Sequence, residues 1–207
     1  MVEDKAQRRG AADDGRDQRR ITIRIARNLN DLMIVASIRS AVYLAEQDCP
    51  YEEEFDGNDL VAAHFIGFID DEPVACLRAR FFADFAKVER LAVRRQYRRS
   101  TIAFRLVRAC VAFLKRKGYR RIYGQAQDRL VDFWARFGAK PLGHNRKLVF
   151  SDFSYTEMLL ELEPDPRAIT IDSDPYVIIR PEGDWDRPGV LDRSSGRPAS
   201  SPLRETV

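Results

Sequence analysis

The stretch KVERLAVRRQYRRSTIAFRL, from Lys87 to Leu106, decides the fold of this chain. It begins as an apolar strand that ends at Val93. A loop follows that carries four arginines, Arg94, Arg95, Arg98 and Arg99. Ser100 or Thr101 then begins a helix, whose first turn presents unpaired N–H groups and a partial positive charge. The stretch therefore predicts an anion site, in which backbone amides and arginines hold a pyrophosphate. A solvated basic loop before an ordinary helix is the competing interpretation.

Apolar periodicity extends this pattern in both directions along the chain. The helix after the loop is the clearest element, because its apolar residues share one face and Gly118 stands where a C-terminal cap belongs. The expected elements are, in chain order, a strand over Ile21–Ala26, a helix capped by Asn30, strands over Ala63–Ile69, Pro73–Phe82 and Ala86–Val93, a helix over Ile102–Lys117, a strand over Arg121–Gln127, a short helix over Leu130–Phe137 and a strand over Asp152–Leu162. This order predicts an α+β fold of the three-layer α/β type, with a mixed, mostly antiparallel sheet and helices on both faces.

The two ends of the chain differ in composition from its middle. Residues 1–20 are charged and have no apolar period, which is typical of a disordered arm. Residues 164–207 hold seven of the ten prolines, so we expect a largely disordered tail, in which the apolar island Tyr176–Ile179 adds a short strand or docks on the surface. A single domain over residues 21–163 is therefore expected, since 44% of the chain is hydrophobic.

Composition also narrows the class of protein. The net charge of +3, from 35 basic and 32 acidic residues, lacks the basic excess of a nucleic-acid binder. No run reaches the roughly 18 apolar residues of a membrane span, and the charged N-terminus is unlike a signal peptide, so we expect a soluble, cytoplasmic protein. The three cysteines are read as reduced thiols, and His64 and His144 are isolated, so no metal is expected.

Three blocks resemble the GNAT superfamily of N-acyltransferases over roughly Ile21 to Leu162. The first is Leu91-Ala92-Val93 followed by Arg98–Ala103, which is similar to the family's pyrophosphate loop, Gln/Arg-x-x-Gly-x-Gly/Ala. Arg98 and Ala103 match that loop, but Thr101 stands where the family usually has a glycine that allows close approach to phosphate. The other blocks are Gln125–Gln127 with Phe133–Gly138, and Val42–Tyr51 with Asp56–Asp59. The last resembles a branch of small bacterial acetyltransferases and, more loosely, the acyl-homoserine-lactone synthases.

The resemblance implies a splay between the fourth and fifth strands, where the donor acetyl-CoA binds without a metal. It implies that an amine attacks the thioester directly while a backbone N–H of the Leu91–Val93 strand stabilises the oxyanion. The cofactor-binding residues that it implies are Leu91, Ala92, Val93, Arg98, Arg99, Ser100, Thr101, Ile102, Ala103, Gln127, Phe133 and Trp134.

Catalytic and acceptor residues are harder to identify. Glu89 is the candidate base that takes the proton of the amine, or else it is a salt-bridged strand residue. The family's tyrosine acid is replaced by Trp134, so Tyr123, Tyr97 or water would protonate the thiolate, unless the thiolate leaves unassisted. The acidic run from Glu52 to Asp59 either attracts a cationic amine or is a solvated loop. The candidate substrate contacts are Arg39, Tyr43 and Glu46.

Three functions remain open at this point. The first is an N-acetyltransferase that acts on a small-molecule or peptide primary amine. The second is a long-chain N-acyltransferase that uses acyl-CoA or acyl carrier protein, which would dock on a basic face that includes Arg94, Arg95 and Arg120. The third is a non-catalytic GNAT-like module that binds CoA or a partner. A monomer or homodimer from a bacterium is expected, with no nucleic-acid partner.

Overall fold

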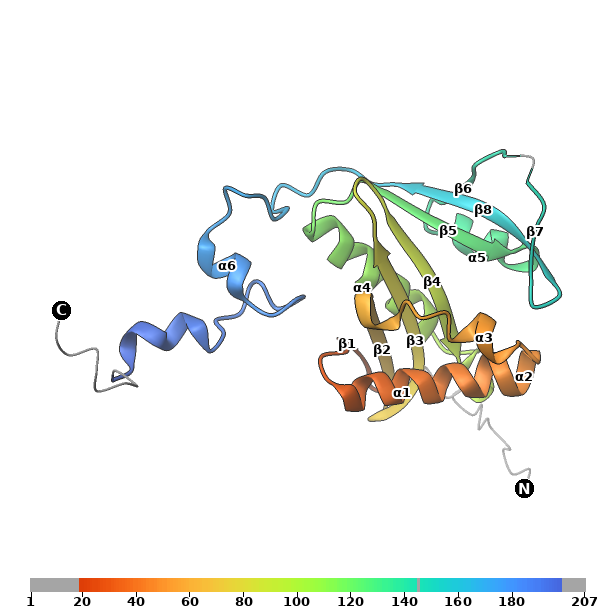
Figure 1. The fold of residues 1–207 in the computed structure, drawn as a ribbon, viewed down its shortest axis with the longest axis horizontal. Coiled ribbons are helices and arrows are strands. Elements are labelled where there is room, and N and C mark those ends of the chain that lie inside the picture. Colours follow the sequence, from red (N-terminus) through yellow and green to blue (C-terminus); the bar gives the residue numbers. More distant parts are fainter. Residues whose placement is uncertain (1–18, 145, 199–207) are drawn as a thin grey trace, which may run out of the picture.

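The structure is a computed structural model that describes residues 19–144 and 146–198 (Figure 1). Most of the expected N-terminal arm, residues 1–18, and the last nine residues lie outside these ranges. The strands are β1 (Ile21–Ile25), β2 (Ala63–Ile69), β3 (Glu72–Phe81), β4 (Ala86–Val93), β5 (Arg121–Gln127), β6 (Lys140–Pro141), β7 (Leu148–Phe150) and β8 (Phe153–Glu161). The α-helices are α1 (Leu29–Arg39), α2 (Ala45–Gln47), α3 (Tyr51–Glu54), α4 (Ile102–Arg116), α5 (Val131–Ala135) and α6 (Pro175–Ile179).

Within the described residues, eight strands form one sheet in the order β1-β2-β3-β4-β5-β8-β6, and β7 pairs with β8. Neighbouring strands are antiparallel except for β4 and β5, which run parallel. Their pairing covers only Ala86–Val88 against Ile122–Gly124, so the two strands separate towards Val93 and Gln127. The predicted mixed sheet and its splay between the fourth and fifth strands are therefore confirmed.

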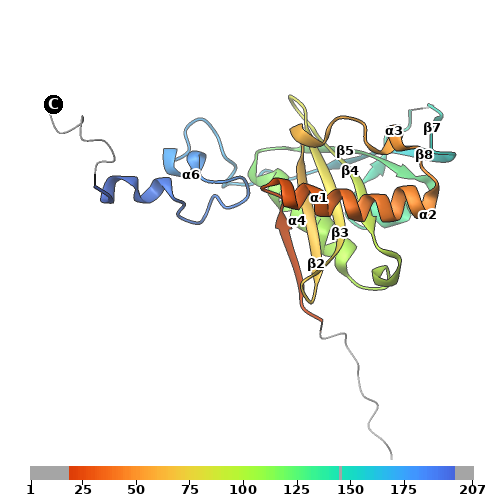
Figure 2. The same cartoon turned by 60° about the horizontal axis from the view of Figure 1, so that its bottom comes forward.

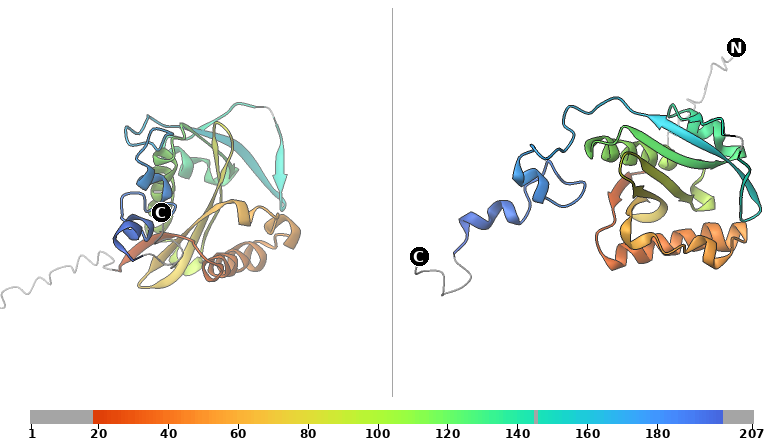
Figure 3. Two further views of the ribbon diagram at one scale, coloured as in Figure 1. Left: turned by 60° about the vertical axis from the view of Figure 1, so that its left-hand side comes forward. Right: turned by 45° about the horizontal axis from the view of Figure 1, so that its top comes forward.

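Helices cover both faces of the sheet (Figures 2 and 3). Because side chains alternate along a strand, Ile66 and Cys76 pack under α1, whereas Phe65 and Leu77 face α4. Helix α4 lies so close to β2 that a Cβ atom on Gly67 would stand 2.8 Å from the Ile102 side chain. This close approach fixes the N-terminus of α4 at the end of β4, where the arginine loop lies.

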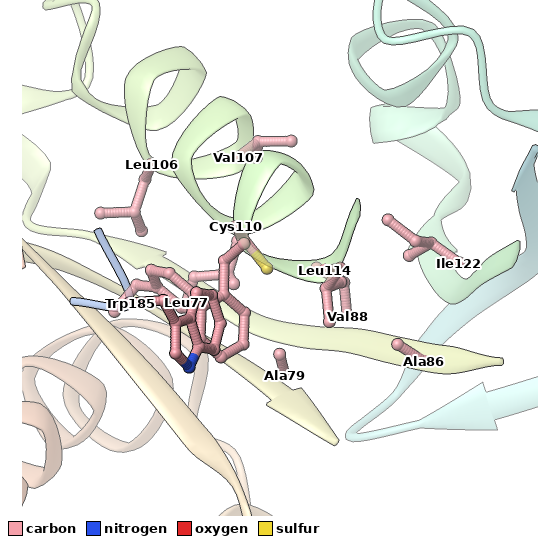
Figure 4. Close-up of a cluster of buried hydrophobic side chains, with 12 residues drawn as sticks. Leu77, Ala79, Ala86, Val88, Leu106, Val107, Cys110, Leu114, Ile122 and Trp185 are labelled. Carbon is pink, nitrogen blue, oxygen red and sulfur yellow. The ribbon is translucent and has the colours of Figure 1, made fainter. Parts of the chain in front are cut away.

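The start of the first helix and the tail differ from expectation. Asn28, not Asn30, caps α1, because its side chain accepts a hydrogen bond from the Asp31 backbone N–H at 2.9 Å. The apolar island forms helix α6 instead of a strand. Further along the tail, Trp185 is buried and stacks on Phe113 of α4, with ring centroids 5.1 Å apart (Figure 4). The division into arm, domain and tail stays a prediction.

Candidate active site

A cleft of about 440 Å³ lies where β4 and β5 separate. Its walls come from distant parts of the chain: the segment between α1 and α3, strands β4 and β5, the start of α5 and the β7–β8 hairpin. A second, apolar hollow of about 30 Å³ adjoins the cleft, and both are lined by Val88, Gln125, Ala126 and Trp134. The separation of β4 and β5 therefore opens a site that β4, β5, β7 and β8 help to enclose.

A β-bulge shapes one wall of this cleft. Cys76 of β3 pairs with Ala92 of β4, and Arg78 of β3 pairs with Glu89 of β4. Two residues of β4, Arg90 and Leu91, therefore stand opposite the one residue of β3 that separates Cys76 from Arg78. Arg90 adopts a left-handed φ of 54°, which is costly for a residue with a side chain. The bulge therefore takes the backbone around Leu91 out of the regular ladder, next to the cleft that Leu91 lines.

Tyr43 holds the bulge from the opposite side of the cleft. It lies in a π-helical turn, Ser40–Leu44, that continues α1. Its hydroxyl group donates a hydrogen bond of 2.9 Å to the Leu91 carbonyl. Burial raises the pKa of Tyr43, so the hydroxyl stays protonated and remains a donor. The sequence proposed Tyr43 as a substrate contact, and the structure places it on the cleft wall.

The predicted phosphate loop leads into α4 as expected. Thr101 is the N-cap residue of α4, but its side chain accepts no hydrogen bond from the backbone N–H groups of the first turn. Arg99 and Thr101 are exposed, whereas the Ile102 side chain is fully buried in the core and Ala103 is half-buried. Of this group, only the backbone and the exposed side chains can therefore meet a ligand.

Arg98 is bound at both ends of its guanidinium. Its Nε donates to the Val93 carbonyl at 3.0 Å, and its terminal nitrogen forms an ion pair of 2.6 Å with Glu46. The side chains of Arg98 and Glu46 are 44% and 26% exposed, so both remain open to solvent. Glu46, proposed as an acceptor contact, thus lies against the phosphate loop and not among the cleft residues.

Glu89 is on the cleft wall but is not a free carboxylate. It accepts hydrogen bonds from buried Arg78 and pairs with Lys87 at 2.7 Å, and its side chain is only 9% exposed. Glu89 is therefore a salt-bridged strand residue, and it also faces the cleft, as the interpretation as a base requires.

The proposed substrate contact Arg39 lies elsewhere. Its side chain is 1% exposed and does not line the cleft. It binds Glu54 and, at 2.5 Å, Asp59. Arg78, also fully buried, binds Asp59 from the other side. The carboxylates of this buried network occupy the guanidinium of Arg39, and its role as a substrate contact stays a prediction.

Tyr123, the proposed acid, lines the adjoining hollow but not the cleft. Its hydroxyl donates to Glu157 at 2.8 Å, and burial together with this carboxylate raises its pKa to about 12. Trp134 lines the cleft, whereas Phe133 packs edge-on against Trp134 and close to Phe104 of α4. Of these residues, only Trp134 is in a position to touch a ligand in the cleft.

Buried Gln127 contacts a tyrosine that the sequence did not identify as a site residue. Tyr155 stands opposite Gln127 in the β5–β8 pairing, and its hydroxyl accepts a hydrogen bond of 3.2 Å from the Gln127 amide. Its own proton is therefore free to point into the cleft, which Tyr155 lines. Only the pairing of β5 with β8 brings this side chain to the site, and no local motif marks it.

A short polar contact joins α3 to the β7–β8 turn along the wall of the cleft. Ser151, in the left-handed turn between β7 and β8, donates to Glu53 of α3 at 2.7 Å and lies 3.0 Å from the Cys49 sulfur. These residues line the cleft, so the acidic run of the sequence does reach the site through Glu53 and Asp56.

In residues 19–144 and 146–198 no cluster of His, Cys, Asp and Glu has the geometry to hold a metal ion. Across the same part of the chain, every helix is too short or too polar to cross a membrane.

Comparisons with known proteins agree with the fold and identify the family. A sequence model described as the acetyltransferase (GNAT) family matches residues 32–139, about half of the chain. An acetyltransferase candidate of Bacillus subtilis is 28% identical over 111 residues, which cover 52% of this chain and 76% of that protein.

Solved structures show the same fold. Escherichia coli ElaA superposes with a TM-score of 0.61 at 24% identity, covering 69% of this chain and all of that one. A GNAT acetyltransferase of Elizabethkingia anophelis with acetyl-CoA bound superposes with a TM-score of 0.50 at 13% identity, covering 69% of this chain and 98% of that one. At these identities the likeness shows the fold alone.

Proposed function

Because the chain belongs to the acetyltransferase (GNAT) family, we propose that it transfers an acetyl group from acetyl-CoA to a primary amine by direct attack. Acyl transfer is the activity of the family, and the donor and the amine are the proposed part. The observation that carries the proposal is the bulged strand β4, which borders a cleft at the splay next to the N-terminus of α4.

The donor's pyrophosphate fits the first turn of α4. In that turn the Thr101 side chain makes no capping bond, the Ile102 N–H reaches Ser100 Oγ only at 3.4 Å, and Arg99 is exposed beside it. Thr101 replaces a glycine of the family pattern, and because its side chain is exposed, a phosphate would have to bind beside this side chain to reach the backbone. Arg98 would exchange its bond with Glu46 for a phosphate oxygen. The same loop thus supplies backbone N–H donors and the positive charge of Arg98, which can move from Glu46 to a phosphate.

The bulge supplies the electrostatic part of the reaction. A backbone N–H near Leu91 that has left the ladder would donate to the oxyanion that forms when the amine attacks the thioester carbonyl. Tyr43 fixes this backbone through the Leu91 carbonyl, so the donor does not have to reorganise during the reaction. Acetyl-CoA supplies the activated acyl group and a thiolate leaving group.

Two proton transfers complete the reaction. Glu89 faces the cleft and would take the amine proton through a water molecule, since Arg78 and Lys87 already occupy its oxygens. Geometry favours Tyr155 over Tyr123 as the group that protonates the thiolate, because the Tyr123 proton is bound to Glu157. Glu53 on the acceptor side supports a cationic amine as the substrate, whereas Asp56 is already paired with Arg78 and Arg90.

Calorimetric titration with acetyl-CoA tests the donor assignment. We expect wild type to bind and Arg98→Glu to lose binding at least tenfold, while Arg167→Glu, a charge reversal on the exposed tail, leaves affinity unchanged. An amine panel with Glu89→Gln as the slow variant then tests transfer. Binding without turnover on any amine would favour the non-catalytic module, and binding of a long-chain acyl carrier protein alone would favour the long-chain enzyme.

A further inference from the structure

We propose that the donor range of this protein extends beyond acetyl to propanoyl and butanoyl thioesters, whose chains fill the apolar hollow at the apex of the splay. This inference rests on the proposed function, because it concerns the acyl group of the same donor. The hollow begins at Val88 and Gly124, the last paired residues of β4 and β5 before the strands separate.

The walls of the hollow are those of an acyl pocket. Its surface is almost entirely apolar, and three elements besides β4 and β5 close it. Helix α4 contributes Val107 and Val111, β8 contributes Met158 and Leu160, and the α5 region contributes Trp134 and Ala139. An apolar cavity of this kind stays dry, so its lining lacks the dispersion contacts that a hydrocarbon group would supply.

The hollow and the cleft are neighbours. Val88, Gln125, Ala126 and Trp134 line both spaces, so the hollow lies beside the place where the reacting acyl group would lie. Trp134 stands at this junction and gives it an aromatic wall. Gly124 also matters, because a Cβ atom there would come within 3.3 Å of the Val88 carbonyl oxygen. The absence of a side chain at residue 124 therefore lets β5 approach β4 closely at the apex, where the hollow begins.

The size of the hollow sets the chain length. One water-sized group needs roughly 10–15 Å³ of such volume, so a hollow of about 30 Å³ takes about two heavy atoms. With the acetyl carbons in the cleft, two further carbons make a butanoyl group. Each buried methylene increases affinity about fourfold. Hexanoyl thioesters exceed the hollow and would have to displace core side chains.

The bond changes are the same for every chain length. The amine nitrogen forms a bond to the acyl carbon, and the C–S bond breaks. The amine proton goes to the base, and the thiolate takes a proton as it leaves. Chain length therefore changes binding and positioning of the donor and leaves the chemical step alone.

The test is calorimetric titration of the full chain with acetyl-, propanoyl-, butanoyl- and hexanoyl-CoA. We expect affinity to rise about fourfold from acetyl to propanoyl, about fifteenfold from acetyl to butanoyl, and to fall for hexanoyl. If no thioester binds, the proposed function and this inference fail together. If acetyl-CoA binds at least as tightly as the longer donors, or hexanoyl-CoA binds as tightly as butanoyl-CoA, only the inference fails.

Two variants locate the effect in the hollow. Val111→Phe fills it from α4 and should reduce the butanoyl-to-acetyl affinity ratio to one or below. Leu160→Ala enlarges it from β8 and should move the preferred chain beyond four carbons. Val177→Phe, the same substitution as the first but on α6, should leave the ratio at its wild-type value. Ratios that stay at the wild-type value in both folded hollow variants would overturn the assignment.

Discussion

The hydroxyl group of Tyr43 lies 2.9 Å from the carbonyl oxygen of Leu91, although 48 residues separate them in the chain. This bond joins a π-helical turn to a β-bulge, and both are irregularities that concentrate at functional sites. The acceptor side and the donor side of the cleft are thereby tied to each other at the point where the oxyanion is proposed to form.

Removing this hydroxyl should slow transfer. Tyr43→Phe keeps the ring but frees the Leu91 carbonyl, so the bulge relaxes and its N–H donor is displaced. We expect kcat to fall at least tenfold, with a loss of about 1 kcal/mol in the free energy of unfolding. Thiol release and chemical denaturation measure the two effects. Tyr176→Phe, on exposed α6, should change neither, and an unchanged kcat in Tyr43→Phe would contradict the role of the bulge.

Glu46 competes with the donor for Arg98. Glu46→Gln removes the ion pair that holds the guanidinium, so we expect acetyl-CoA to bind about two- to fivefold more tightly, which is the range of exposed ion pairs. Calorimetry at two salt concentrations measures this change. Glu72→Gln releases Arg94 in the same way and is the matched control. Because Arg94 is not among the residues implied for donor binding, acetyl-CoA affinity should stay at the wild-type value in this variant. Weaker donor binding by Glu46→Gln would instead place Glu46 itself in contact with the ligand.

Arg39 distinguishes a structural role from a substrate role. Arg39→Met leaves buried Glu54 without its main partner, and we expect a loss of about 3–5 kcal/mol in the free energy of unfolding. Glu53→Gln, on the cleft wall, should leave stability nearly unchanged and raise the KM of a cationic amine. A folded Arg39→Met protein of normal stability with a raised amine KM would restore the original assignment.

Trp185 anchors the tail to the domain. It is 6% exposed, stacks on Phe113, and is flanked by ion pairs of Arg27 with Asp184 and of Arg116 with Asp186. Trp185→Ala should lower the free energy of unfolding by about 3 kcal/mol and expose the tail to proteolysis. Trp185→Phe, which keeps an aromatic ring on Phe113, should lose less than half as much. Equal stability of wild type and Trp185→Ala would show that the tail does not dock.

His64 should make stability depend on pH. Burial holds the pKa of this imidazole below its ordinary value of 6.5, so it is neutral in the folded protein while the unfolded chain takes up a proton. The free energy of unfolding should therefore be constant above about pH 6.5 and decrease as the pH falls below it. His64→Gln keeps a donor for the Asp59 carbonyl but does not titrate, so its profile should be flatter down to about pH 4. Identical profiles would contradict a neutral His64.

Sequence periodicity by itself determined the order of the main strands and helices. The β4 strand, the arginine loop and helix α4 follow one another directly between residues 86 and 116, so strand and helix periods and capping residues suffice to predict them. The Arg98 loop was found for the same reason. Helix α6 was missed, because short apolar runs do not distinguish a strand from one turn of helix.

Only the tertiary structure decided which side chains meet. Tyr155 reaches the cleft through the pairing of β5 with β8, and Tyr43 reaches Leu91 across 48 residues of chain. The sequence proposed Arg39 as a substrate contact, yet packing buries it among carboxylates that follow it by 15 and 20 residues. The hollow beside Trp134 exists because three separate elements close over the splay. Periodicity is a local property of the chain, whereas burial, pairing and cavity volume depend on how distant segments pack.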